Sequence, residues 1–155
     1  MGFWNAATEV RTSVVKATGL DGSTEVGALR WFRDRVGGPV VDFDVVYRDG
    51  DYWKQARNGN TSTARPPLSI VRSLLSGAGT PISSGEAVLS IAQGRVEYSS
   101  WAFTSGARAF LGTSGDITAT PPTASGSVVV TLGRFYSAIG IEFDPDAKRV
   151  IQIGD

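Results

Sequence analysis

Acidic side chains at alternating positions are the first candidates for chemistry in this 155-residue chain. Asp42 and Asp44 alternate with apolar residues, so on a strand they would share one face, with Cα atoms about 6.5–7 Å apart. Such a pair could serve as the two carboxylates of a glycosidase. Adjacent carboxylates on a solvated strand face are far more common. We therefore interpret this pair as surface charge.

A second acidic series, Glu142, Asp144 and Asp146, lies near the C-terminus. On a continuous strand these side chains would share one face, and their oxygens could bind calcium. Pro145 interrupts such a strand, and the spacing of a calcium-binding loop is missing. The sequence therefore favours a turn built on Asp-Pro-Asp, and we expect no metal and no other cofactor.

The chain contains no histidine and no cysteine. A Ser-His-Asp triad, thiolate chemistry and Cys-ligated zinc are therefore excluded. The Gly-x-Ser-x-Gly nucleophile elbow and the Gly-rich loop of nucleotide hydrolases are also missing from the sequence. We expect the protein not to be an enzyme.

Aromatic side chains are the remaining candidates for binding. Tyr52, Trp53, Tyr98 and Trp101, together with Phe103, could form a platform on which sugar rings stack, because each ring offers an apolar face. The competing interpretation, which we favour, is that these rings pack in the core or between subunits.

The residue types of the first third of the chain also suggest contacts with other subunits. Phe3 and Trp4 are hard to place in a core, and an apolar anchor in an N-terminal arm explains them better. Twelve of the fifteen cations are arginine, which pairs and stacks well in interfaces. The candidate interface residues are Phe3, Trp4, Arg11, Trp31 and Arg33.

Charge and hydropathy limit the classes of partner. Fifteen basic residues balance fifteen acidic ones, so no broad attraction to nucleic acid or to a membrane surface is expected. No apolar run approaches the roughly 18 residues of a transmembrane helix. The length fits one domain, or one domain with an arm.

Residues 1–38 differ from the remainder of the chain. Residues 1–24 read as an extended arm or as a first strand. Residues 24–36 predict a short helix, with Thr24 as its cap and Gly37-Gly38 as its stop. The apolar stripe of that helix would be Val26, Leu29, Phe32 and Val36, with Trp31 outside it.

Short alternating runs separated by turn residues follow in residues 39–155. The expected elements are a hairpin over 39–57 that turns at 48–51, a strand over 68–75, strands over 86–92 and 95–98 around Gln93-Gly94, a hairpin over 109–119 that turns at Ser114-Gly115, and strands over 127–132, 134–141 and 148–153. Strands at this spacing predict an all-β domain, a small antiparallel β-barrel or sandwich, preceded by the N-terminal arm and the short helix.

The order of these turns resembles a family of β-modules on tailed-bacteriophage particles. The matching segments are Val45-Val46-Tyr47 with its Tyr-Trp return strand, Ala64-Arg65-Pro66, Gly85 to Val88 with Gly94 to Val96 as a central hairpin, Phe110 to Thr118, Pro121-Pro122, Gly126, Val129, Gly133-Arg134-Phe135 and Ile141 to Asp146. The resemblance spans residues 39–155, and residues 1–38 have no counterpart in it.

The resemblance implies a structural protein of the virion surface, commonly a homotrimer. Its partners would be copies of itself and the major capsid protein or other virion proteins. We expect a capsid decoration or head-fibre subunit, with residues 1–38 as the candidate attachment segment. The alternative is a tail-fibre module that reads a host surface glycan through Tyr52, Trp53, Tyr98 and Trp101.

Overall fold

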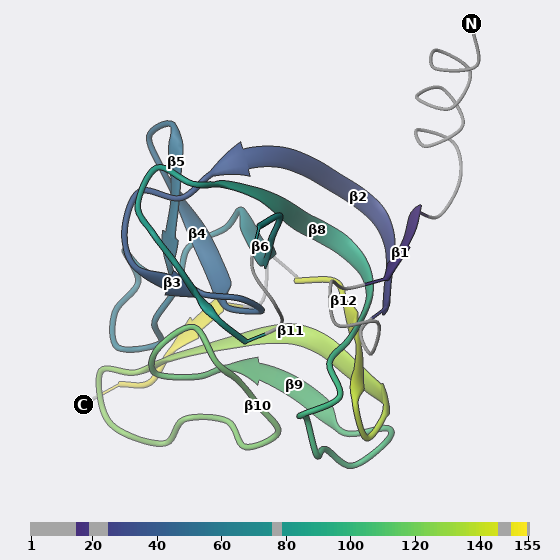
Figure 1. The fold of residues 1–155 in the computed structure, drawn as a ribbon. Helices are drawn as coiled ribbons and strands as arrows, with labels where there is room; N and C mark the ends of the chain where they lie inside the picture. The colour runs from purple at the N-terminus through teal and green to yellow at the C-terminus, as the bar shows by residue number, and fades with distance from the viewer. Residues whose placement is uncertain (1–14, 19–24, 76–78, 146–149, 155) are drawn as a thin grey trace, which may run out of the picture.

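The protein is an antiparallel β-sheet curled into a half-barrel, as shown by a computed structural model that describes residues 15–18, 25–75, 79–145 and 150–154 (Figure 1). These residues form thirteen strands and no helix. The prediction of an all-β barrel or sandwich is therefore confirmed.

The strands are β1 (Val15–Thr18), β2 (Glu25–Arg35), β3 (Val40–Val41), β4 (Val45–Asp49), β5 (Tyr52–Gln55), β6 (Leu68–Ser73), β7 (Pro81–Ile82), β8 (Ala87–Glu97), β9 (Arg108–Leu111), β10 (Ile117–Thr118), β11 (Val128–Ser137), β12 (Gly140–Phe143) and β13 (Val150–Gln152). The main path through the large sheet is β10-β9-β11-β12-β8-β6-β4-β5. In addition, β1 pairs with β2, β2 with β8 and β13 with β11, while β3 and β7 form a separate two-stranded sheet.

Strand β8 joins the two halves of the fold. One of its edges pairs with β2 over almost the whole length of both strands, which Figure 1 shows as two neighbouring arcs. On the other edge, its first half pairs with β6 and its second half with β12. The two strands predicted around Gln93-Gly94 are thus one strand, because Gly94, at a φ of 142°, bends the chain without reversing it.

The predicted helix over residues 24–36 is wrong: residues 25–35 are strand β2. The four apolar residues fit one face of a helix, but the backbone of this segment pairs with β8 along nearly its whole length, and this pairing determines the strand conformation. Register shifts on either side of Arg30 let β2 follow the curve of β8. Strand β1 then pairs with the first part of β2.

Some of the other expected strands also need correction. The separate strands over 127–132 and 134–141 are wrong, because β11 passes through Gly133 at a φ of 136°, and the chain turns only between Ser137 and Gly140. The hairpins that turn at Gly50 and Gly115 are confirmed, with φ of 60° and 77°. The first strand of the hairpin predicted over 39–57 is wrong in its first part, because residues 40–41 form β3, which pairs with β7. The strand predicted over 68–75 is confirmed as β6.

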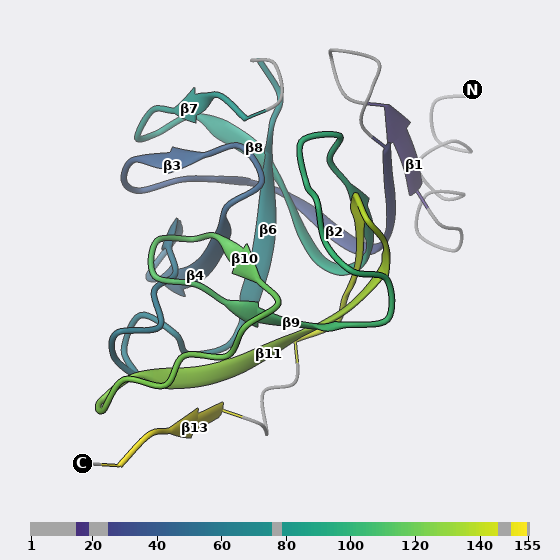
Figure 2. The same ribbon diagram turned by 90° about the horizontal axis from the view of Figure 1, so that it is seen from below.

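The core consists of two apolar clusters on opposite faces of β4, β6 and β8. Adjacent residues show the division: Ile70 belongs to the larger cluster and Val71 to the smaller one, as expected when side chains alternate along a strand. The larger cluster packs against β9, β11 and β12, and the smaller one lies beneath β3 and β7. Figure 2 shows these two groups of strands on either side of β4 and β6.

Candidate functional site

Asp42 and Asp44 are buried, so their interpretation as surface charge is wrong. They lie in the turn that links β3 to β4, on either side of Phe43, whose backbone adopts a positive φ of 76°. That turn interrupts the strand on which the two carboxylates were expected to share a solvated face. Both carboxylates instead face inward and bind neighbouring segments.

The contacts of these carboxylates are structural. Asp42 accepts hydrogen bonds from the Nε of Arg72 at 3.1 Å and from the backbone N of Ser73 at 2.7 Å. Asp44 accepts bonds from the backbone N of Val41 and from Nε2 of Gln55, both at 2.9 Å. Burial raises the pKa of Asp44 above its ordinary value. With their oxygens engaged in the fold, the two residues do not have the arrangement of a glycosidase pair.

The four predicted sugar-stacking residues do not form one platform. Trp53 is buried in the smaller core cluster with 5% of its surface exposed. Tyr98 and Trp101 pack against the larger cluster, where Tyr98 stacks on Phe43 with ring centroids 4.2 Å apart. Of these four residues, only Tyr52 is exposed, with 46% of its surface accessible to solvent. The core interpretation that we favoured therefore fits Trp53, Tyr98 and Trp101.

Among the residues that the structure describes, the exposed aromatic side chains are Phe32 on β2, at 50% exposure, and Tyr52 on β5. Trp31, a predicted interface residue, instead packs against the larger core cluster. Arg33, another predicted interface residue, is exposed. The predicted contacts Phe3, Trp4 and Arg11 lie outside the described residues.

The helical interpretation concealed Phe32, because it placed Phe32 on the same apolar face as Val36. In the strand, neighbouring side chains point to opposite faces, so burial of Trp31 leaves Phe32 on the outer face. Residues 31–35 gave no clear strand signal, because alternation would place Trp31 with Arg33 and Arg35, and Phe32 with Asp34, so that each side mixes aromatic and charged residues.

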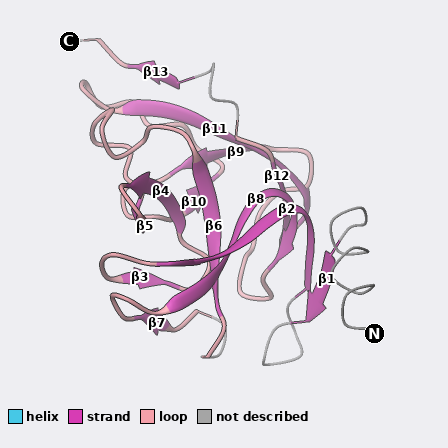
Figure 3. Ribbon diagram, turned by 90° about the horizontal axis from the view of Figure 1, so that it is seen from above, coloured by secondary structure: helices cyan, strands magenta, loops and turns pink. Residues whose placement is uncertain are grey.

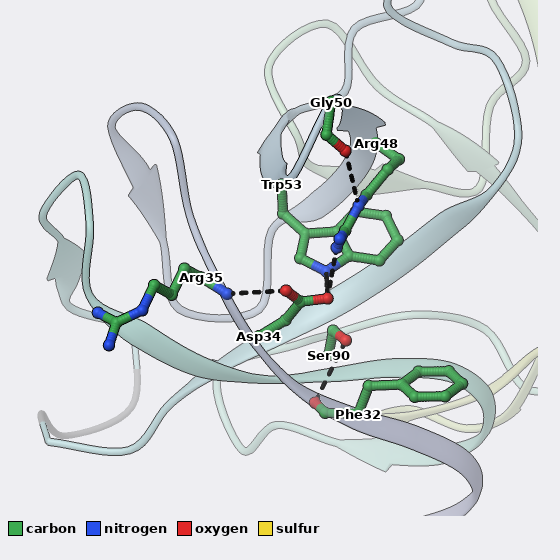
Figure 4. Close-up of polar contacts among 7 residues, drawn as sticks. All are labelled: Phe32, Asp34, Arg35, Arg48, Gly50, Trp53 and Ser90. Carbon is green, nitrogen blue, oxygen red and sulfur yellow. Dashed lines mark hydrogen bonds and ion pairs between the residues drawn. The ribbon is translucent and has the colours of Figure 1, made fainter.

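A polar group next to Phe32 holds β2 against β5. The Asp34 carboxylate accepts bonds from Nη1 of Arg48 and from Nε1 of Trp53, the latter at 2.9 Å (Figure 4). The Arg48 guanidinium lies 5.1 Å from the centroid of the Trp53 ring. A parallel bridge from Val36 to Trp53 continues this contact. The outer face of β2 is therefore fixed in place.

We call the region formed by Phe32, Arg33, Asp34, Arg35 and Tyr52 the β2 surface. Its side chains do not all share one face, because Phe32 and Arg35 extend in opposite directions from β2 (Figure 4). All of these except Phe32 line one hollow of about 320 Å³, together with Asp51 and Ala87. Within the described residues, β1 covers the outer edge of β2 only over residues 25–28. The β2 surface thus combines exposed aromatic rings, arginines and an open strand edge.

The acidic residues near the C-terminus that the structure describes do not form a cluster. Glu142 lies on β12 and pairs with Arg95, with Oε1 and Nη2 3.0 Å apart, and Asp144 follows that strand. Asp146 lies outside the described residues. In the part of the chain that the structure describes, no three acidic residues form a group that could hold a metal ion. The same part contains no helix long and apolar enough to cross a membrane.

Comparison with known proteins adds no assignment, since the chain matches no protein-family model and no curated protein. The β2 surface is therefore the feature of the molecule from which a function can be argued.

Proposed function

We propose that the protein is a non-enzymatic structural component of a tailed-phage virion, a capsid decoration or head-fibre subunit. It assembles with copies of itself as a homotrimer and binds the major capsid protein or another virion protein. The β2 surface takes part in these contacts.

The observation that carries this proposal is the composition of the β2 surface. Interface centres are enriched in aromatic residues and arginine and depleted in lysine, glutamate and aspartate. Phe32 and Tyr52 are about half exposed. Arg33, Arg35 and Tyr52 line one hollow, which contains no lysine or glutamate but does contain Asp34 and Asp51. Aromatic residues and arginine are also the usual binding hot spots.

The open edge of β2 supports the same proposal. Beyond residue 28, the outer edge of β2 meets another described strand only at the Val36 bridge to Trp53. Unpaired backbone groups on a strand edge are a ready template for another chain, and proteins usually block such edges. An edge that carries Phe32 is therefore better suited to a partner than to water.

The tail-fibre alternative receives less support from the residues that first suggested it. Three of the four candidate sugar contacts pack against the two core clusters. A glycan reader built from that set would have only Tyr52 to offer as an exposed ring.

Binding to purified particles tests this proposal. We expect the gold-labelled protein to decorate phage heads in electron micrographs and the Phe32→Ser variant to lose at least tenfold in occupancy. The matched control is Ile151→Ser, which removes another exposed apolar side chain from β13, well away from β2 (Figure 3). Label confined to tails, or equal loss in both variants, would contradict the proposal.

A further inference from the structure

A second hollow, of about 390 Å³, lies beside the β4–β5 hairpin and is chemically unlike the first. The hollow is lined by residues 37–39, between β2 and β3, and by Tyr47, Lys54, Gln55, Arg57 and Thr63. A Cβ at Gly37 would lie 2.6 Å from the Cβ of Tyr52, so Gly37 approaches the strand bearing Tyr52 this closely only because it carries no side chain.

The charges of the two hollows differ. In the first, Asp34 and Asp51 accompany the two arginines. In the second, the lining residues include Lys54 and Arg57 and no carboxylate. A third cation, Arg65, lies 6.0 Å from the centroid of the Tyr47 ring. In a chain with no net charge, these three cations leave a local excess of positive charge, although Asp49, which pairs with Lys54, offsets part of it.

Both lining cations can still bind a ligand. Arg57 donates through Nε to the Gln55 amide oxygen over a long 3.4 Å, and no described carboxylate pairs with it. Lys54 binds Asp49 with Nζ and Oδ2 2.7 Å apart, in an exposed pair that contributes little to stability. This contact raises the pKa of Lys54, which therefore stays cationic at neutral pH. Its ammonium group has three N–H donors.

The chain around Arg57 is fixed before any ligand arrives. The backbone N of Arg57 donates to the carbonyl of Thr63 at 3.1 Å, and the Thr63 hydroxyl donates to the carbonyl of Arg57 at 3.0 Å. These two bonds close the intervening loop. Less conformational entropy is therefore lost when the guanidinium binds.

We propose that this second hollow binds a uronate unit of an acidic polysaccharide. The planar guanidinium of Arg57 matches the two oxygens of a sugar carboxylate, and Lys54 adds a second charge-assisted bond. Tyr47 packs partly against the larger core cluster, and only the part of its ring that lines the hollow can contact a sugar ring. The hollow is open to the surface, as a polymer chain requires, and its residues are distinct from the stacking residues that the sequence suggested.

Calorimetric titration with tetragalacturonate tests the site. We expect a dissociation constant of about 1 mM for tetragalacturonate. This binding should be at least tenfold tighter than that of the uncharged galactose tetrasaccharide or of inorganic phosphate. The Arg57→Gln variant should bind at least tenfold more weakly, since it loses a charge-assisted contact. Arg108→Gln, which removes an exposed arginine from β9, should stay within twofold of the natural protein.

Several results would overturn the inference. Absence of binding by the natural protein, or equal affinity of the Arg57 and Arg108 variants, would remove the site. Equal affinity for the uncharged tetrasaccharide would show that charge does not contribute to binding. Equal affinity for inorganic phosphate would show that the hollow binds anions without recognising the sugar. Unchanged melting temperatures are expected for both variants because the two side chains are exposed. The test is independent of particle binding, so it can fail while the virion proposal stands.

Discussion

The Asp42 carboxylate and the Arg72 guanidinium form an ion pair inside the protein, with Oδ1 and Nε 3.1 Å apart and side-chain exposures of 0% and 7%. The pair fastens the turn between β3 and β4 to strand β6. The same guanidinium lies 4.0 Å from the centroid of the Phe43 ring, which in turn stacks on Tyr98. A turn with a positive φ at a large aromatic residue is thus held by charge on one side and by stacking on the other.

Removing one partner of this pair should destabilise the protein strongly. We expect Asp42→Ala to lower the free energy of unfolding by about 3–5 kcal/mol, because it leaves the Arg72 charge buried without a partner. Arg72→Met should also be destabilising, and the double variant should lose less than the sum of the two, since neither charge then remains. Urea unfolding of all four proteins measures this, and strict additivity would contradict the account.

Asp44 should give stability a distinctive pH dependence. Burial raises its pKa in the folded state, so the folded protein holds this proton more tightly than the unfolded chain. Its contribution to stability is full below the ordinary value of 3.8 and is lost as pH rises through the raised folded pKa. Nearby Asp116 and Asp42 raise the pKa further.

The Asp44→Asn variant isolates this contribution, because its amide oxygen can still accept the bonds from Val41 and Gln55. We expect the stability of the natural protein relative to the variant to fall as pH increases from 3.8 upward. Unfolding free energies measured across the acid range give the difference directly. A flat difference, or one that rises with pH, would show that burial does not control this carboxylate.

Two glycines with positive φ provide a matched test of packing. A Cβ at Gly133 would lie 1.9 Å from the carbonyl oxygen of Glu142, whereas a Cβ at Gly126 would meet nothing within 4 Å. We expect Gly126→Ala to cost only about 1–2 kcal/mol, for the backbone conformation. Gly133→Ala should cost considerably more, because β11 and β12 must separate. Thermal unfolding compares the two, and similar losses would contradict this description of the contact between β11 and β12 at Gly133.

The sequence predicted the elements whose signal is local. The hairpins at Gly50 and Gly115 follow from turn chemistry, and β6 follows from its apolar run between proline and glycine. The strand ends predicted at Gly94 and Gly133 are wrong, because a glycine can either reverse a strand or bend it. Which of these occurs depends on the partner strand, and that information is not local.

The candidate site was harder to predict for the same reason. Phe32 fits a helical stripe as well as it fits the outer face of a strand, and only pairing with β8 decides between them. Asp42 and Asp44 read as a solvated pair until the β3–β4 turn brings Asp42 against Arg72, thirty residues away in the chain. Long-range contacts of this kind leave no periodic signal in the sequence.

The molecular mass in solution tests the central claim, that the β2 surface mediates assembly, most directly. Sedimentation equilibrium should give the mass of three chains for the natural protein and for Ile151→Ser. Phe32→Ser should dissociate towards one chain with an unchanged β-sheet circular dichroism spectrum, because loss of an aromatic hot spot costs about 2 kcal/mol or more. A single-chain mass for the natural protein at every concentration, or an intact trimer of Phe32→Ser, would contradict the claim.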